Sequence, residues 1–173
     1  MTAPFSPASV TPAQLLYSDL DSELAVTRRI LERVPDGRAD FRPHPKSTEL
    51  GALAQHLAEL PRLAVMVLSS DELDWATSPY VPTAFTTTAA VLDSFDRESA
   101  GMRAAVDAMT WEDVNKRWVM RAGDQIFVEG RKGPLVRTFG LSHIAHHRAQ
   151  LGVYLRLLDI PVPSVYGPTA DEQ

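Results

Sequence analysis

The chain has 173 residues, a net charge of −5 at pH 7 and no cysteine. This length is sufficient for one domain with a sizeable core, so we expect a single domain over residues 1–173. The absence of cysteine excludes disulfides, thiolate catalysis and cysteine-based zinc sites. The acidic balance, with Lys and Arg dispersed along the chain, predicts no nucleic-acid partner.

The chain also lacks the sequence features of a membrane protein. No apolar run approaches the length of a membrane span. The first residues, Met1–Pro7, have neither the basic region nor the apolar region of a signal peptide. We therefore expect a cytoplasmic protein with no membrane partner.

The first predicted helix begins at Thr11 and Pro12, because a hydroxyl N-cap followed by proline is typical of a helix start. Apolar residues then recur at helical spacing as far as Val34, and Pro35 and Gly37 end the pattern. A single helix over these residues is expected.

A second helix is predicted after the candidate N-caps Ser47 and Thr48, with apolar residues recurring to Val67. His56 lies in its apolar face. Pro61 is expected to kink the helix just beyond His56, because proline lacks the amide that an inner helical turn requires.

The next segment, residues 69–83, contains prolines and is interpreted as a connection that crosses the bundle. We expect burial of Trp75 and Tyr80 to hold this connection in place. A third helix is predicted from Thr86–Thr88 to Met109.

Two short β-prone runs, Trp118–Arg121 and Gln125–Val128, flank Gly123 and predict a small hairpin. The last predicted helix runs from Leu135 to Leu158. The proline-rich segment Ile160–Pro168 cannot be helical and is expected to pack back over the helices through Val162, Val165 and Tyr166. The predicted fold class is therefore all-α: a four-helix bundle with one long crossover and a small hairpin before the last helix.

The segment Ser142–Gln150 of the last helix contains three of the five histidines. His143 and His147 are four residues apart, which places them on one face of a helix, one turn apart. Two imidazoles in this arrangement can chelate a metal. The pair is not a zincin motif, because Ile144 stands where that motif requires glutamate. A solvent-exposed pair, or histidines satisfied within the core, remain alternatives.

His56 on the second helix is the candidate third ligand, since metal sites in helical bundles are built from facing helices. Three neutral imidazoles leave at least one position for water or substrate, which is typical of catalytic sites. Glu59, three residues after His56, is interpreted as a surface acid, with a base or a partner of the ligands as the alternative. His44, between two prolines, is interpreted as a surface or packing residue.

The run His143-x-x-His146-His147-Arg148-Ala149-Gln150-Leu151, with Tyr154–Leu158 and Ile160–Pro163 after it, resembles the C-terminal signature of the DinB proteins, which belong to the DinB/YfiT-like superfamily. The segment Leu53–Leu60 resembles the histidine segment of that family's second helix. One departure is Ala149, where the family commonly has glycine.

This resemblance implies a four-helix bundle, often dimeric, in which three histidines hold a divalent metal: zinc, nickel or iron. These histidines correspond to His56, His143 and His147. Some relatives are transferases or isomerases that depend on thiols such as bacillithiol or mycothiol.

Three hypotheses follow. The first is a metal-dependent enzyme, a thiol-dependent transferase or a hydrolase, that acts on a small electrophilic substrate. The second is a non-catalytic, stress-associated metal-binding bundle that acts as a dimer, and the third is that the histidines are structural. His146, Gln150 and Glu59 are candidates for contacts with the ligands or the substrate. Arg148 is expected to face away and form an ion pair.

Overall fold

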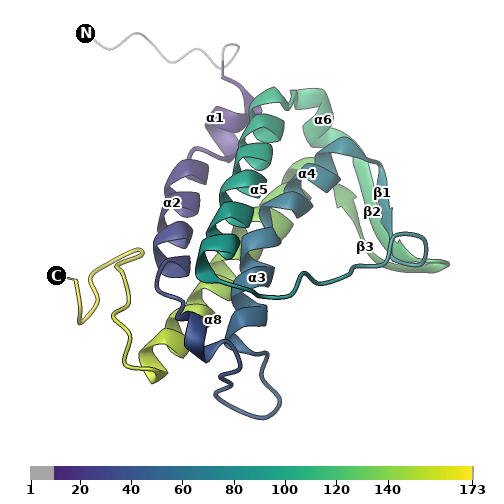
Figure 1. Ribbon diagram of the computed structural model, residues 1–173. Coiled ribbons are helices and arrows are strands. Elements are labelled where there is room, and N and C mark those ends of the chain that lie inside the picture. Colours follow the sequence, from purple (N-terminus) through teal and green to yellow (C-terminus); the bar gives the residue numbers. More distant parts are fainter. Residues whose placement is uncertain (1–9, 173) are drawn as a thin grey trace, which may run out of the picture.

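The structure, a computed structural model, describes residues 10–172 (Figure 1). The segment Met1–Pro7, for which no signal peptide was predicted, lies outside the described residues. The helical segments are α1 (Pro12–Leu16), α2 (Leu20–Leu31), the short 3₁₀ turn η2 (Asp36–Arg38), α3 (Leu50–Glu59), α4 (Pro61–Ser69), α5 (Thr88–Ala108), α6 (Trp111–Asn115), α7 (Lys132–Val136), the π-helical segment η3 (Arg137–Ser142) and α8 (His143–Leu157). The strands β1 (Glu72–Asp74), β2 (Arg117–Ala122) and β3 (Gln125–Arg131) form one sheet in that order.

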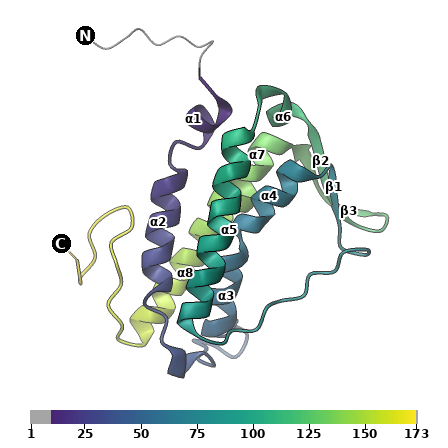
Figure 2. The ribbon, with the colours of Figure 1, turned by 45° about the horizontal axis from the view of Figure 1, so that its top comes forward.

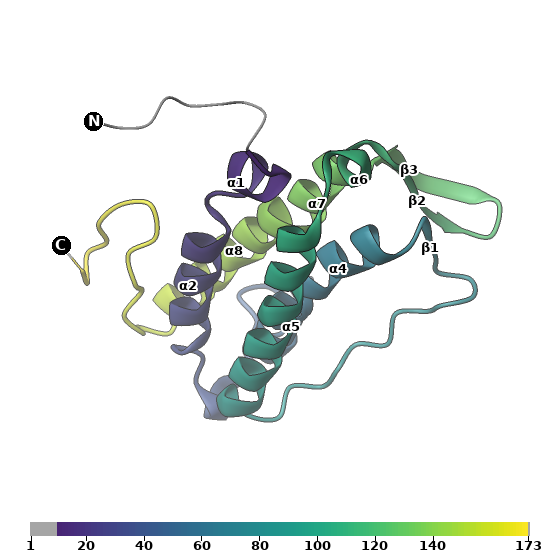
Figure 3. The same cartoon turned by 90° about the horizontal axis from the view of Figure 1, so that it is seen from above.

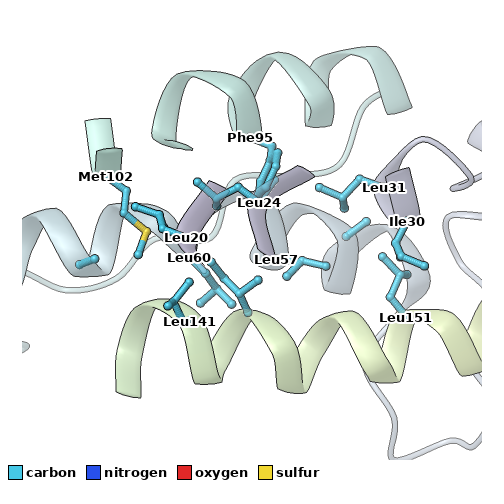
Figure 4. Close-up of a cluster of buried hydrophobic side chains, with 14 of the residues drawn as sticks. Leu20, Leu24, Ile30, Leu31, Leu57, Leu60, Phe95, Met102, Leu141 and Leu151 are labelled. Carbon is cyan, nitrogen blue, oxygen red and sulfur yellow. The ribbon is translucent and has the colours of Figure 1, made fainter. Parts of the chain in front are cut away.

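The long helices enclose one apolar core. α5 packs on α2, α3 and α4, and α8 packs on α2 and α3 (Figures 1 and 2). Figure 4 shows side chains from these helices meeting in the interior, among them Leu24, Leu57, Phe95 and Leu151, each at most 1% exposed. The sheet lies at one end of the helices (Figure 3). The chain is thus mostly helical with a small sheet, and the prediction of an all-α class needs that correction.

The first predicted helix is in fact two helices. The break lies at residues 17–19, where the Tyr17 hydroxyl donates to the carbonyl oxygen of Gly133 at 2.6 Å. Asp19 pairs with Arg137 at 2.7 Å. The prediction of one continuous helix was wrong because apolar spacing continues across a break at which both residues contact the distant α7–η3 segment.

The second predicted helix is interrupted after Leu60, and α4 begins with Pro61, as expected from its missing amide. The predicted N-caps at residues 47–48 were wrong, because Glu49 occupies the cap position without a side-chain hydrogen bond. The amides of Leu50 and Gly51 donate instead to the carbonyl oxygens of Phe41 and Ala39, both at 2.9 Å. A side-chain cap is therefore not needed.

The predicted hairpin is confirmed. β2 and β3 pair antiparallel, and Gly123 in their turn has a φ of +57°, which favours glycine. The connection over residues 69–83 contains a strand that was not predicted, β1, which pairs parallel with β2 so that Glu72 faces Val119. The expected burial of Tyr80 is also corrected, since its side chain is 41% exposed.

The last helical segment begins earlier than predicted, at Lys132, and η3 interrupts its α-helical hydrogen bonding just before His143. The C-terminal segment packs back on the helices through Val162 and Val165, as predicted. Tyr166 is 77% exposed, and it contacts the helices through a hydrogen bond from its hydroxyl group to Glu23 of α2 and through its ring, whose centroid lies 5.2 Å from the Arg148 guanidinium of α8. Within residues 10–172, no helix has both the length and the apolar character that crossing a bilayer requires.

Candidate metal centre

Packing of α3 against α8 brings three predicted ligands together. The Nε2 atoms of His143 and His147 lie 2.9 Å apart. The His56 ring lies across from them, with its centroid 5.4 Å from that of His143 and 4.8 Å from that of His147. One nitrogen from each ring can be chosen so that all three lie within 4.8 Å of one another.

These separations fit a metal ion. Metal–nitrogen bonds of 2.0–2.1 Å in tetrahedral geometry place the ligand nitrogens about 3.3 Å apart. The nitrogens of His143 and His147 are slightly closer than that, and His56 lies somewhat farther away. The spacing of the three nitrogens is therefore close to that of a metal site.

The electrostatic environment keeps the three imidazoles neutral. Burial, together with the smaller effect of the neighbouring imidazoles, lowers the pKa of His143 to about 4. Burial also lowers the pKa of His56, although the charge of Glu59 opposes this. It lowers the pKa of His147 as well, against the opposing effect of the hydrogen bond that the ring donates to Gln150. Neutral imidazoles retain the lone pair that a metal ligand needs.

Gln150 orients one of the ligands. Its side-chain oxygen lies 2.7 Å from Nδ1 of His147. An amide oxygen only accepts hydrogen bonds, so the ring donates from Nδ1, and its Nε2 lone pair points toward His143 and His56. A partner on the outer nitrogen is how metal-binding histidines are commonly held.

The other two histidines are not part of this cluster. His146 is exposed; its ring centroid lies 4.7 Å from that of His147, and it contributes no nitrogen to the group of three. His44 is exposed in the loop before α3, where its Nδ1 accepts a hydrogen bond from the Lys46 amide. The interpretation of His44 as a surface residue is confirmed.

Glu59 is a buried acid, 7% exposed, so the interpretation of this residue as a surface acid was wrong. Its carboxylate accepts hydrogen bonds from the Gln55 amide at 2.9 Å and from the Tyr80 hydroxyl at 3.2 Å. This places a carboxylate on the same helix as His56, one turn further along, and links it to the connection that carries Tyr80.

A pocket of about 870 Å³ opens beside the histidines. His56 and His143 line it. Apolar and aromatic side chains also line it, from the junction of α3 and α4, from α4, from the connection that follows β1, from β2 and from η3: Leu60, Leu63, Met66, Trp75, Pro79, Tyr80, Val81, Met120 and Phe139. Its remaining lining residues are Glu59, Arg62 and Ser78.

Sequence reasoning identified the ligands but not this pocket. Tyr80 lies between Pro79 and Pro82, and prolines at this spacing favour an extended backbone. This signal could have suggested that Tyr80 lines a pocket and is not buried in the core. Met120 gave no such signal, because its place beside the pocket depends on the pairing of β2 with β1.

Arg148 faces away from the cluster, as predicted. It is 2% exposed and pairs with Glu23 of α2 at 2.8 Å. It also donates to the hydroxyl groups of Thr27 and Tyr166. Arg148 therefore joins α8 to α2 and to the C-terminal segment, which stabilises the helix that carries two of the histidines.

The fold is similar to those of three solved structures. A DinB-like protein from Bacillus cereus matches with a TM-score of 0.66 and 19% identity, over 87% of this chain and 95% of that protein. A DinB-like protein from Bacillus subtilis matches with a TM-score of 0.63 and 15% identity, over 90% of this chain and 96% of that protein. A protein described as a DinB-family member, from Exiguobacterium sibiricum, matches with a TM-score of 0.65 and 19% identity, over 90% of this chain and 97% of that protein.

At these identities the three structures show a shared fold. No curated protein sequence matches the chain significantly. The family model described as the DinB family matches residues 9–173. The chain belongs to the DinB family.

Proposed function

We propose that the protein holds a divalent metal ion, zinc, nickel or iron, through His56, His143 and His147, and that it is a metal-dependent enzyme acting on a small electrophilic molecule. The observation that carries this proposal is the grouping of three neutral imidazoles, two of which, those of His56 and His143, line a pocket. The imidazole ligands suit each of the three metals.

An open coordination position supports an enzyme over a structural metal site. The group of potential ligands within residues 10–172 consists of the three histidines, whereas structural zinc sites usually have four protein ligands. His56 and His143 both border the pocket, so a substrate there would meet the open side. A metal bound at this position would supply Lewis acidity, which lowers the pKa of a water or thiol.

The protein's own side chains would supply the rest of the site. Gln150 orients His147, and Glu59 presents a carboxylate to the pocket beside His56. The apolar wall would exclude water from a bound substrate and so strengthen electrostatic interactions within the site.

The reaction type we propose is thiol-dependent transfer, with a low-molecular-weight thiol as second substrate, or hydrolysis. Membership of the DinB family supports this choice. The proposal also includes a four-helix-bundle arrangement, a homodimer and a cytoplasmic location, without nucleic-acid or membrane partners. The alternative is a non-catalytic, stress-associated metal-binding dimer, which a site closed by a fourth protein ligand would favour.

The test is elemental analysis of untagged protein purified without chelator, beside His143→Ala and, as a control, His44→Ala. We expect one metal ion per chain in the parent and in His44→Ala, and none in His143→Ala, with unchanged helical circular dichroism in all three. Metal retained by His143→Ala would overturn the ligand assignment. A parent that takes up no zinc, nickel or iron on reconstitution would overturn the metal site itself. Metal-loaded protein is then assayed for thiol transfer and for hydrolysis.

A further inference from the structure

The pocket beside the histidines is built for an apolar ligand. Its volume of about 870 Å³ lies within the range of small-molecule sites. Trp75 and Tyr80 contribute to one wall with their rings 6.3 Å apart, and Met66, Met120 and Phe139 are among the residues that complete it. Aromatic and thioether side chains pack favourably against aromatic rings. The walls therefore favour a ligand with a flat, apolar body.

Two charged side chains line this pocket, and their surroundings differ. Glu59 is buried and accepts hydrogen bonds from two neutral donors, those of Gln55 and Tyr80. The side chain of Arg62 is 47% exposed, and its contact with Glu59, at 3.9 Å, is too long for a hydrogen bond. Across residues 10–172 no other carboxylate pairs with Arg62.

Arg62 is thus a cation at the edge of the pocket. Its guanidinium N–H groups donate no hydrogen bond to any residue from 10 to 172. A guanidinium group binds carboxylates with two parallel hydrogen bonds, in a geometry that a neutral group does not reproduce. The negative charge on the histidine side of the pocket is the Glu59 carboxylate, which already accepts hydrogen bonds from Gln55 and Tyr80. The Arg62 guanidinium group is the cationic partner that remains among the lining residues. An anionic group on the ligand therefore has a specific partner at the rim.

We infer that the pocket binds a small molecule with an apolar, aromatic-type body and a carboxylate, and that Arg62 is the residue that selects the anion. The opposite end of the ligand lies toward His56 and His143. That this end is the one that reacts rests on the proposed function. Arg62 is a binding residue in this assignment.

The test uses two probes of similar shape, naphthoate, which is an anion, and naphthalenemethanol, which is neutral. Their affinities are measured by isothermal titration calorimetry for metal-free and zinc-loaded protein. We expect the parent to bind naphthoate more tightly than naphthalenemethanol. Arg62→Gln should lower the naphthoate affinity roughly tenfold and leave the naphthalenemethanol affinity within about twofold, since only the charged hydrogen bonds are removed.

Two further variants serve as controls. Arg62→Lys keeps the charge and should retain part of the preference for naphthoate. Arg33→Gln removes a positive charge from an exposed position that does not line the pocket, and it should bind both probes as the parent does. If Arg33→Gln lost as much affinity for naphthoate as Arg62→Gln, the effect would be due to the net charge of the protein. That result would overturn the inference.

Equal affinity of the parent for the two probes, or no binding of either, would also overturn the inference. Metal content is measured on the same samples, which separates the two proposals. Zinc bound without any preference for naphthoate overturns the role of Arg62 and leaves the metal site standing. A preference that depends on Arg62 in protein that takes up no zinc, nickel or iron supports the ligand class and overturns the metal site.

Discussion

The Nδ1 atom of His147 lies 2.7 Å from the side-chain oxygen of Gln150, three residues further along α8. This contact fixes which ring nitrogen faces the other two histidines. We predict that Gln150→Ala weakens zinc affinity by about tenfold or more, the usual effect of removing such a partner. Competition with a chromophoric chelator measures the change.

His146→Ala is the matched control, because His146 is an exposed neighbour on the same helix and supplies no nitrogen to the cluster. Its zinc affinity should stay close to that of the parent. If the His146 variant lost as much affinity as the Gln150 variant, the orienting role of Gln150 would be wrong.

The hydrogen bond between Tyr80 and Glu59 should be detectable as a coupling energy. Tyr80→Phe and Glu59→Gln each weaken the bond, so we expect their effects on the free energy of unfolding to be non-additive by about 1 kcal/mol. Urea unfolding of the parent, the two single variants and the double variant measures this. A second cycle, Tyr166→Phe with Glu59→Gln, should be additive. Additivity in both cycles would show that the connection is not held by this contact.

Gly51 of α3 is required by the close approach of two segments, the loop before α3 and the connection that precedes α5. A β-carbon at this position would lie 2.8 Å from Cγ of Phe85 and 2.9 Å from Cβ of Ala39. Gly51→Ala should therefore destabilise the protein by about 1–3 kcal/mol, as overpacking does.

Gly101→Ala provides the opposite case. Gly101 lies in α5, and the nearest atom to a β-carbon there is Cγ2 of Val65 in α4, 3.8 Å away. Alanine there should stabilise the protein by about 0.5–1 kcal/mol, because it favours the helical backbone. Thermal unfolding of both variants tests the pair. A Gly51 variant as stable as the parent would contradict the packing argument.

Ionisation of Tyr17 should lower the free energy of unfolding at alkaline pH. Burial raises its pKa to about 12, against the opposing charge of Arg137, whereas the ordinary value is 10.0. Between these two values the unfolded chain releases the proton and the folded chain keeps it. The free energy of unfolding contributed by Tyr17 is therefore complete below pH 10 and falls as the pH rises toward 12.

Urea unfolding across this interval should show a shallower decline for Tyr17→Phe than for the parent. Near neutral pH the same variant should be about 1 kcal/mol less stable, because it lacks the hydrogen bond to Gly133. Parallel declines in alkali would mean that the Tyr17 hydroxyl titrates alike in both states.

Much of the site follows from local rules. The relation of His143 to His147 depends only on helical geometry, which places residues four apart on one face. The kink after His56 follows from the missing amide of Pro61. The hairpin follows from two β-prone runs around a glycine. Each of these features depends on residues close together in the chain, so the amino-acid order alone was sufficient to predict it.

The remaining features depend on residues far apart in the chain. The burial of Glu59 requires Tyr80 to reach it from the connection, and the strand β1 exists only through its pairing with β2. The break after α1 accompanies contacts with Gly133 and Arg137. Such contacts form only when the helices have packed together. A pattern of neighbouring residues in the sequence therefore does not predict them. The pocket, and the place of Arg62 at its rim, therefore became visible in the folded chain alone.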